Sequence, residues 1–227
     1  ALVARADRAP PMSPQVAAYW YVFLKGVGIT LWISWLALIL GGVVGLVIGL
    51  LRIAPWAIVR WAAIVYIEVF RSVPPLVLFF GCFYGLSYAM KLDLSPFSAA
   101  TIALTLTASA LMAEVVRAGI ESVTRGQWEA ALSQGMTYPQ VFRYVIWPQA
   151  IRVMLPPSVG VYISTLKDSS LASIIGYVEL TKSGLLVRES TGISFEVLLI
   201  IAILYFIINY SISLVGTALE RRFKYVH

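Results

Sequence analysis

The sequence predicts an all-α integral membrane protein with five transmembrane helices and one long helical loop on the cytoplasmic side. Two observations support this fold class. Of the 227 residues, 60% are hydrophobic and only 12% are charged, with a mean hydropathy of +0.86. Soluble domains carry about 25% charged residues, so this chain has too few polar side chains to cover a water-facing surface. The charges also stand far apart, leaving uncharged runs that can cross the roughly 30 Å hydrocarbon layer as helices of about 20 residues.

The composition argues against several functional classes. The net charge is +6, from 17 Lys and Arg against 11 acids, but the bases stand singly at the ends of apolar runs. A nucleic-acid-binding protein would gather them on one face. Cys82 is the one cysteine and His227 is the one histidine. We therefore expect no disulfide framework, no metal site and no Cys/His nucleophilic catalysis within this chain.

The chain is expected to begin with a tail and then a first span. Residues 1–19 are polar and contain three prolines, without the layout of a signal peptide, which predicts a mobile N-terminal tail before a membrane domain of residues 20–227. The first uncharged run, 26–51, predicts the first span. Its small residues predict close helix packing within the subunit: Gly41, Gly42, Gly45 and Gly49.

The second and third spans follow closely on each other. The second run, 72–90, contains Pro74-Pro75, which removes two amide donors and predicts a kink or a break. The third run is 94–113. Ser95 is expected to cap its helix and Pro96 to occupy the first helical position, as in a short turn between antiparallel neighbours.

The fourth run, 153–178, is apolar except for Lys167 and Asp168 near its middle, and the fifth is 197–219. Five spans place the termini on opposite sides of the membrane. The positive-inside rule favours an outer N-terminus and a cytoplasmic C-terminus. Nine bases then lie inside against six outside: Arg52, Arg60, Arg117, Arg125, Arg143, Arg152, Arg221, Arg222 and Lys224, against Arg5, Arg8, Lys25, Lys91, Lys182 and Arg188.

The one long connection, 121–147, predicts two short amphipathic helices that meet at an angle. In the first, Trp128, Ala131 and Leu132 share one face, and Gly135 suits a left-handed helix end. The second is expected to start with capping residue Thr137, Pro139 in the first turn and Gln140 at the third helical position, and to end at Pro148.

This loop fits a groove on a soluble protein better than it fits lipid headgroups. Lys and Arg on the polar face would favour lipid, but residues 127–140 contain neither and do contain Glu129.

The loop also resembles the EAA motif of ABC importer permeases of the type I fold. The pattern of that family is E-A-A, three residues, G, nine residues, I, one residue and L-P. Glu129-Ala130-Ala131, Gly135, Val145 and Trp147-Pro148 match it in order, with Val for Ile and Trp for Leu, both apolar. Other stretches are similar to the polar amino acid branch of the family: 68–74, 114–120, 148–150 and 166–171. The resemblance covers about residues 19–224.

The resemblance implies the membrane-spanning permease subunit of an ABC-type amino acid uptake system in a bacterial inner membrane, with 121–147 as its coupling loop. The implied partners are a second permease subunit, identical or homologous, two ABC ATPase subunits and an extracytoplasmic amino-acid-binding protein. The expected ATPase contacts are Trp128, Glu129, Ala130, Ala131, Leu132, Gly135, Phe142 and Pro148. The sequence has no Gly-rich G-x-x-x-x-G-K-[ST] loop, so we expect ATP and Mg²⁺ on the partner ATPase and neither cofactor nor catalysis here.

Charged groups within the apolar runs are the candidate substrate site. One ionised side chain at the centre of a span costs about 2.5–3.5 kcal/mol on insertion scales, and such groups are functional by default. We expect Lys167, Asp168 and nearby hydroxyls to meet the carboxylate and ammonium of a zwitterion; the hydroxyls are those of Ser164, Thr165, Ser169 and Ser170. The alternative is a structural ion pair, mutual or with Arg71 or Glu68.

Two further pairs of charges have simpler explanations. Glu68 and Arg71 share a helix face, which allows a local ion pair as readily as a substrate role. Glu114 and Arg117 repeat that spacing at the cytoplasmic end of the third span, where snorkelling to water suffices.

Two other functional classes stay open at this point. An intramembrane enzyme would need a Ser-Lys arrangement around Lys167. A channel-forming or scaffold subunit without ATP-driven transport would need polar residues on several spans, and the first and last spans lack pore-lining polarity.

Overall fold

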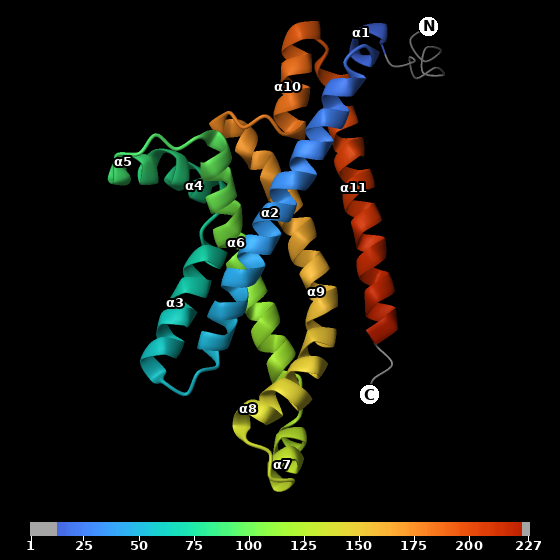
Figure 1. Cartoon of the computed structure of the whole chain (residues 1–227). Coiled ribbons are helices and arrows are strands. Elements are labelled where there is room, and N and C mark those ends of the chain that lie inside the picture. Colours follow the sequence, from blue (N-terminus) through green and yellow to red (C-terminus); the bar gives the residue numbers. More distant parts are fainter. Residues whose placement is uncertain (1–12, 224–227) are drawn as a thin grey trace, which may run out of the picture.

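The computed structural model describes residues 13–223, and every regular element within them is a helix. Figure 1 shows an elongated bundle in which α7 and α8 project from one end and α1 and α10 from the other. The elements are α1 Pro14–Ala17, α2 Trp20–Arg52, α3 Ala57–Ser72, α4 Pro75–Phe80, the π-helix η1 Gly81–Leu86, α5 Ser87–Met90, α6 Pro96–Glu121, α7 Arg125–Ser133, α8 Tyr138–Val141, the π-helix η2 Phe142–Ile146, α9 Trp147–Asp168, the 3₁₀-helix η3 Ser169–Ile175, α10 Leu180–Thr191 and α11 Ser194–Phe223.

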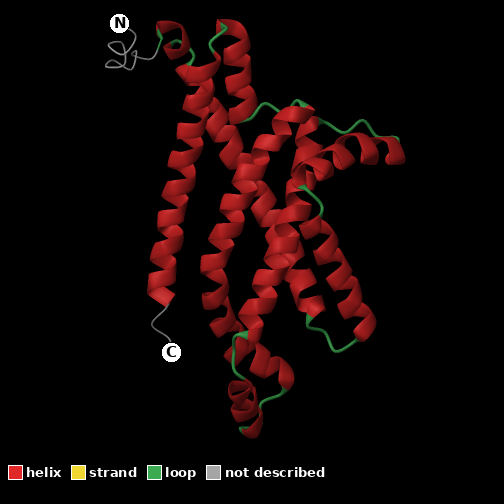
Figure 2. Cartoon of the chain, turned by 180° about the vertical axis from the view of Figure 1, so that it is seen from behind, coloured by secondary structure: helices red, strands yellow, loops and turns green. Residues whose placement is uncertain are grey.

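The expected number of five membrane crossings is reached when bent helix pairs are counted as single spans. Three helices, α2, α6 and α11, are each long and apolar enough to cross a membrane alone. The other two crossings are α3 with the segment Pro75–Met90, bent by 104°, and the segment Tyr138–Ile175 with α10, bent by 46°. The view from behind shows these helices joined by short loops (Figure 2).

The centre of the bundle is the crossing of α2 over α6, where glycines let the two backbones approach. A Cβ added at Gly45 would stand 2.6 Å from the carbonyl oxygen of Ser109 and 2.7 Å from Met112 Cβ. Gly41 and Gly49 meet α6 in the same way, one helical turn to either side, whereas Gly42 faces open space. The expectation that these glycines serve packing within the subunit is therefore confirmed for three of the four.

The break at the two prolines is confirmed, but the limits of the second span were wrong. Val73 and Pro74 are extended, with ψ of 128° and 134°, because a residue that precedes proline is kept out of the helical region. The helix before the break is α3, which contains Arg60, Glu68 and Arg71. Counting only uncharged residues therefore placed the second span one helix too late.

The start of α6 agrees with its sequence signals. The Ser95 side chain accepts a hydrogen bond from the backbone N–H of Ser98 at 3.2 Å, and Pro96 is the first helical residue.

The helix α9 of the fourth span starts and ends earlier than the predicted run 153–178. Pro148 does not end the second loop helix, because the π-turn η2 precedes it and α8 continues through η2 into α9. A π-turn adds one residue to a turn and so accommodates a proline that would clash in a regular helix. At the other end α9 stops at Asp168 and η3 follows. Lys167 and Asp168 thus lie at the C-terminal end of α9 and not at the middle of that helix.

Part of the expected tail belongs to the folded bundle. Residues 1–12, with Arg5 and Arg8, and residues 224–227, with Lys224 and His227, lie outside the described residues. From Ser13 onward the chain is packed: Val16 is 1% exposed, and the Ser13 hydroxyl donates to Glu196 Oε2 at 2.8 Å. The boundary at residue 19 was therefore drawn too far along the chain, because Val16 contributes to an apolar cluster with Phe23, Leu180 and Val187.

Candidate functional site

The long loop 121–147 forms a helical elbow at the end of the bundle. The first arm, α7, gives way to a left-handed Gly135, with φ of +84°, and α8 begins two residues later. Gln140 Oε1 accepts from the backbone N–H of Thr137 at 2.8 Å and from its hydroxyl at 3.0 Å. These contacts confirm the predicted turn and restart, and Figure 1 shows α7 and α8 beyond the ends of α6 and α9.

The apolar face of this elbow packs against the core of the helical bundle itself. Ala131 is buried, and Trp128, Leu132 and Phe142 are partly buried against the same cluster, which includes Val116 and Ile146. Part of this apolar face is therefore covered by the chain itself, and its docking into a groove on another protein stays a prediction. The expected contact residues that remain exposed are Glu129, Ala130, Gly135 and Pro148.

Above the elbow, an ion network joins α2 to α6. Arg52 Nε lies 3.0 Å from Glu114 Oε1, and Arg117 Nη2 lies 2.8 Å from Glu114 Oε2. Arg117 also pairs with Glu121 one turn further on. Glu114 and Arg117 are thus engaged within the chain, which goes beyond the snorkelling that their position alone suggested.

The charged and hydroxyl residues around the end of α9 are divided between two environments. The Thr165 and Ser169 hydroxyls are buried and donate to carbonyls of their own helix, at 2.9 Å to Val161 O and 2.7 Å to Leu166 O. Lys167 and Ser170 instead line a cavity between α9 and α11. Asp168 is half-buried, and Ser164 is exposed.

Glu68 and Arg71 are not brought into this cavity. Both side chains are exposed on α3, and none of the ion pairs between described residues joins them to each other or to Lys167 and Asp168. The alternatives based on a local ion pair or on pairing with α9 are therefore not found in the described structure.

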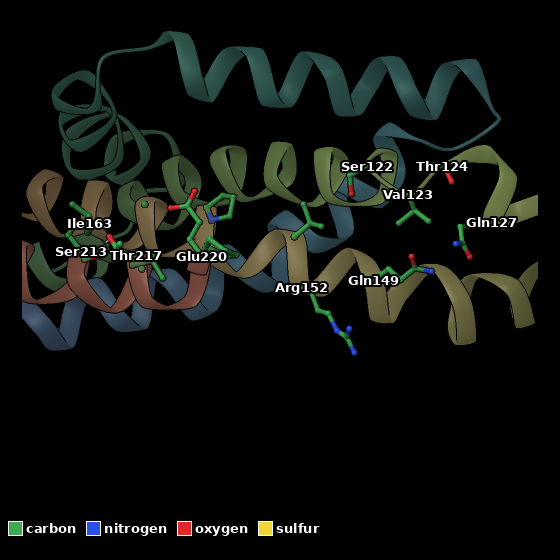
Figure 3. Close-up of a pocket in the computed structure, with 16 residues that line it drawn as sticks. Ser122, Val123, Thr124, Gln127, Gln149, Arg152, Ile163, Ser213, Thr217 and Glu220 are labelled. Atoms are coloured by element: carbon green, nitrogen blue, oxygen red, sulfur yellow. Dashed lines mark hydrogen bonds between the residues drawn. The ribbon is translucent and has the colours of Figure 1, made fainter. Parts of the chain in front are cut away.

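Two adjoining cavities follow the seam between α9 and α11. The outer one has a volume of about 550 Å³ and contains Lys167. The inner one, of about 820 Å³, lies at the end next to the elbow, and Ile163 and Ser213 line both. Figure 3 shows the inner cavity, with Ser122, Thr124 and Gln127 from the start of the loop, Gln149 from α9, and Thr217 and Glu220 from α11. The Arg152 side chain points away from the others in this view.

The last span supplies polar residues that sequence reasoning missed. Tyr205, Asn209 and Ser213 line the outer cavity, and Ser213 and Thr217 line the inner one. The expectation that this span lacks polar lining was therefore wrong. The available signal was the spacing of four residues, which keeps these side chains on one helix face.

Sequence reasoning also missed a buried carboxylate at the outer end of the seam. Glu179 is 0% exposed and caps α10 by accepting from the backbone N–H groups of Thr181 at 2.8 Å and Lys182 at 2.9 Å. It also accepts from the Tyr205 hydroxyl at 2.8 Å and from Thr30 Oγ1 at 3.4 Å. Glu179 therefore links α2, α10 and α11, a role that no local pattern indicated.

Residues 13–223 hold no group of three or more His, Cys, Asp or Glu side chains suited to a metal ion.

The chain matches a known family over most of its length. The family model described as binding-protein-dependent transport system inner membrane component matches residues 41–225. The probable glutamine ABC transporter permease protein GlnM of Bacillus subtilis (strain 168) is 35% identical over 203 residues, covering 89% of this chain and 94% of that protein. The glutamine transport system permease protein GlnP of Escherichia coli (strain K12) is 36% identical over 204 residues, covering 89% and 93%.

Solved structures agree with the fold. A chain from the crystal structure of an amino acid ABC transporter with histidines aligns with a TM-score of 0.86 at 36% identity, covering 91% of this chain and 96% of that one. A chain of the inward-facing MetNI methionine ABC transporter aligns with a TM-score of 0.79 at 22% identity, covering 91% and 98%, and shows the shared fold.

Proposed function

The chain belongs to the family of binding-protein-dependent transport system inner membrane components and is the permease subunit of an ABC-type amino acid uptake system, and from this premise we propose how it couples ATP hydrolysis to transport. It is a multi-pass inner-membrane protein. The elbow of α7 and α8 is the element that receives the force of the ATPase.

The exposed side of the elbow is the proposed contact with the ATPase. Ala131 and Val141 hold it against the permease core, while Glu129, Ala130 and Gly135 face outward. An element fixed on one side and exposed on the other can transmit a movement without deforming. Because α8 continues through η2 into α9, a push on the elbow moves the helix that lines both cavities.

The proposed assembly contains two permease subunits, identical or homologous, and two ATPase subunits that bind ATP and Mg²⁺. An extracytoplasmic amino-acid-binding protein delivers the substrate. One feature of the chain favours a second permease subunit: Glu68 and Arg71 are exposed on a helix of the membrane domain, where contact with lipid would be costly.

We place the N-terminus outside and the C-terminus in the cytoplasm. Arg52 at the end of α2, and Arg221 and Arg222 at the end of α11, then lie on the same side as the elbow, as the positive-inside rule favours. In this orientation α1 and α10 face the binding protein.

The substrate is proposed to enter the outer cavity and leave through the inner one. Lys167 offers an ammonium to the carboxylate of the amino acid, and Asp168 beside it offers a carboxylate to the substrate ammonium. Ser170 lines the same cavity as Lys167. Thr165 and Ser169 support the end of α9 through their bonds to its carbonyls.

The coupling proposal rests on the elbow. Two separate variants test it, one with a reversed charge on the elbow and one control with a reversed charge at the other end of the bundle. Glu129→Lys changes the exposed face of α7, and the control Glu189→Lys makes the same change on exposed α10. We expect Glu129→Lys to lose ATP-driven amino acid uptake in proteoliposomes and to lose co-purifying ATPase, with normal membrane insertion. The control should keep its ATPase. Full ATPase association in Glu129→Lys would refute the docking assignment.

A further inference from the structure

The three ion pairs found between residues 13–223 form one chain of alternating charge near the elbow. Arg52 pairs with Glu114 at 3.0 Å, Glu114 pairs with Arg117 at 2.8 Å, and Arg117 pairs with Glu121. Arg52 is the last residue of α2, and the other three residues stand on α6. The contact between Arg52 and Glu114 is therefore the one ion pair of this chain that joins two helices.

The backbone of α6 is in close contact with two other helices at the same level. A Cβ added to Gly49 of α2 would stand 2.8 Å from the carbonyl oxygen of Ala113 on α6. A Cβ added to Gly119 of α6 would stand 3.2 Å from the carbonyl oxygen of Ala150 on α9 and would overlap the side chain of Met154. Close-packed contacts of this kind transmit displacement, so α2, α6 and α9 form one block at this end of the bundle.

The elbow rests on this block. Ala131 of α7 and Val141 of α8 are buried in one apolar cluster with Val116 of α6. Leu50, near the end of α2, packs against the same cluster. The end of α2 is therefore part of the surface that holds the elbow, and its ion pair with Glu114 fixes it to α6.

The opposite end of α2 is anchored to the start of α10. The Thr30 hydroxyl oxygen accepts from the backbone N–H of Leu180 at 3.0 Å, and the hydroxyl donates to Glu179 Oε2 at 3.4 Å. A Cβ added to Gly26 would stand 2.9 Å from Leu180 Cα, so the two backbones touch here. The helix is unbroken from Thr30 to Arg52, a length of about 33 Å at 1.5 Å per residue. In Figure 1, α2 runs from the region of α10 to the end of the bundle that carries the elbow.

We propose that Glu114 is a positioning residue for the coupling of ATP hydrolysis to transport. Through Arg52 it makes α2 follow the elbow, so that the movement imposed by the ATPase reaches α10 along α2 as well as the cavities along α9. The inference rests on the proposed function, in which the elbow receives that movement and α10 faces the binding protein. The side chains of Arg52 and Glu114 are partly exposed, and such ion pairs contribute little to the stability of a fold.

The test measures amino acid uptake and ATP hydrolysis in the same proteoliposomes, which hold the complex of permease and ATPase together with the binding protein. The probe is a mixture of radiolabelled L-amino acids, so that the identity of the substrate does not enter. Glu114→Gln keeps the size of the side chain and removes its charge. We expect the uptake per ATP hydrolysed to fall by at least about fivefold, the lower end of the usual coupling between distant sites, while the ATPase stays bound and active.

Matched variants separate the link between helices from the charges themselves. Glu121→Gln removes a carboxylate of the same ion chain that pairs within α6, and it should leave the uptake per ATP unchanged. Arg52→Gln should lose as much as Glu114→Gln, and the double variant should lose no more than either single one, since all three remove the same contact. Arg52→Lys should keep most of the coupling, because the contact is an attraction between charges and not a well-aligned hydrogen bond.

Thr30→Val tests the other end of α2. It keeps the shape of the side chain and removes the bonds to Glu179 and Leu180, so the uptake per ATP should fall as it does in Glu114→Gln. The control Thr107→Val removes a hydroxyl that bonds to a carbonyl of its own helix, and it should have no effect. An unaffected Thr30→Val would overturn the path along α2.

The remaining outcomes separate this inference from the function on which it rests. An unchanged uptake per ATP in Glu114→Gln, or an equal loss in Glu121→Gln, would overturn the positioning role. A Glu114→Gln complex that melts earlier and loses uptake and hydrolysis in proportion would mark Glu114 as purely structural and would overturn it too. Should Glu114→Gln fail to insert into the membrane, Arg52→Gln decides by the same measurement. A wild type without ATP-driven uptake contradicts the proposed function itself.

Discussion

An acidic side chain among membrane helices needs either a permanent cation or a ligand that brings one. Asp168 is half-buried at the end of α9, and no ion pair between described residues involves it. Its neighbour Lys167 points about 100° away around the helix, because an α-helix has 3.6 residues per turn. No described cation therefore pairs with the Asp168 carboxylate, and in the proposed function the ammonium of the substrate does so.

We therefore predict that Asp168→Asn impairs uptake far more than folding. The amide keeps the shape and hydrogen-bonding capacity of the carboxylate and removes only its charge. ATP-dependent uptake should fall by at least about tenfold, the loss expected for one charge-assisted hydrogen bond, while the melting temperature in detergent stays close to that of the wild type.

If Asp168 is purely structural, Asp168→Asn should instead lower the melting temperature, and a second substitution should restore uptake. Losing it would leave a cation without its partner, the protein would melt earlier, and neutralising that cation by Lys167→Gln or Arg71→Gln would restore yield and uptake. Recovery of function through such a second change would reject a substrate contact.

At the scale of elements, the bundle depends on the crossing of α2 and α6, where glycines of α2 contact the backbone of α6. We predict that Gly45→Ala destabilises the protein by about 1–3 kcal/mol, the usual cost of overpacking a close contact. The new methyl group would stand 2.6 Å from a backbone oxygen of α6, which cannot rotate away as a side chain could.

Gly42→Ala is the matched control for this prediction. It lies on the same helix and faces open space, so replacing glycine there should stabilise the helix by about 0.5–1 kcal/mol or leave it unchanged. Thermal unfolding in detergent compares the two. Equal melting temperatures would mean that the approach of α2 to α6 does not limit stability.

The continuity of α8, η2 and α9 matters at the same scale. A proline normally breaks a helix, but the π-turn at 142–146 carries the chain past Pro148 without a loop. The elbow is therefore continuous with the helix that lines the two cavities, and in the proposed mechanism a break in this segment disconnects ATP hydrolysis from transport.

For the whole molecule, the arrangement across the membrane is the first property to test. We predict that a cysteine at position 140 is labelled by an impermeant maleimide only from the cytoplasmic side, and a cysteine at position 93 only from outside. Gln140, in α8, and Asp93, in the connection before α6, are both exposed, and the proposed orientation places them on opposite sides. Cys82→Ala provides the background, since Cys82 is buried.

Labelling of both positions from one side, or with the sides exchanged, would overturn the orientation. Protease-treated inverted vesicles give an independent control for the sidedness of the reagent.

The class of protein and its coupling loop were predictable because their signals are local. Spacing between charges measures span length directly, and capping residues act within one turn, as at Ser95 and Gly135. The match of 129–148 to a known motif needed no knowledge of packing. The limits of spans were less predictable, because a helix such as α3 tolerates charges that simple counting treats as boundaries.

The candidate site was only partly predictable. Lys167 and Asp168 are conspicuous in an apolar run, but whether each faces a cavity depends on the rotation of α9 against α11. The apolar character of Trp128 and Leu132 does not say whether this chain or a partner covers them. Both pack partly against the core of this chain.

What the sequence by itself determined is a helical membrane protein with a break at Pro74-Pro75, an elbow at Gly135 and charges that need a role, since each follows from the chemistry of a few adjacent residues. What only the tertiary structure decided is which distant residues each side chain contacts. The Glu179 carboxylate meets Thr30, 149 positions earlier, and Tyr205, 26 positions later. Such contacts depend on how distant helices dock, and docking is set by the sum of many weak contacts that no single stretch of sequence contains.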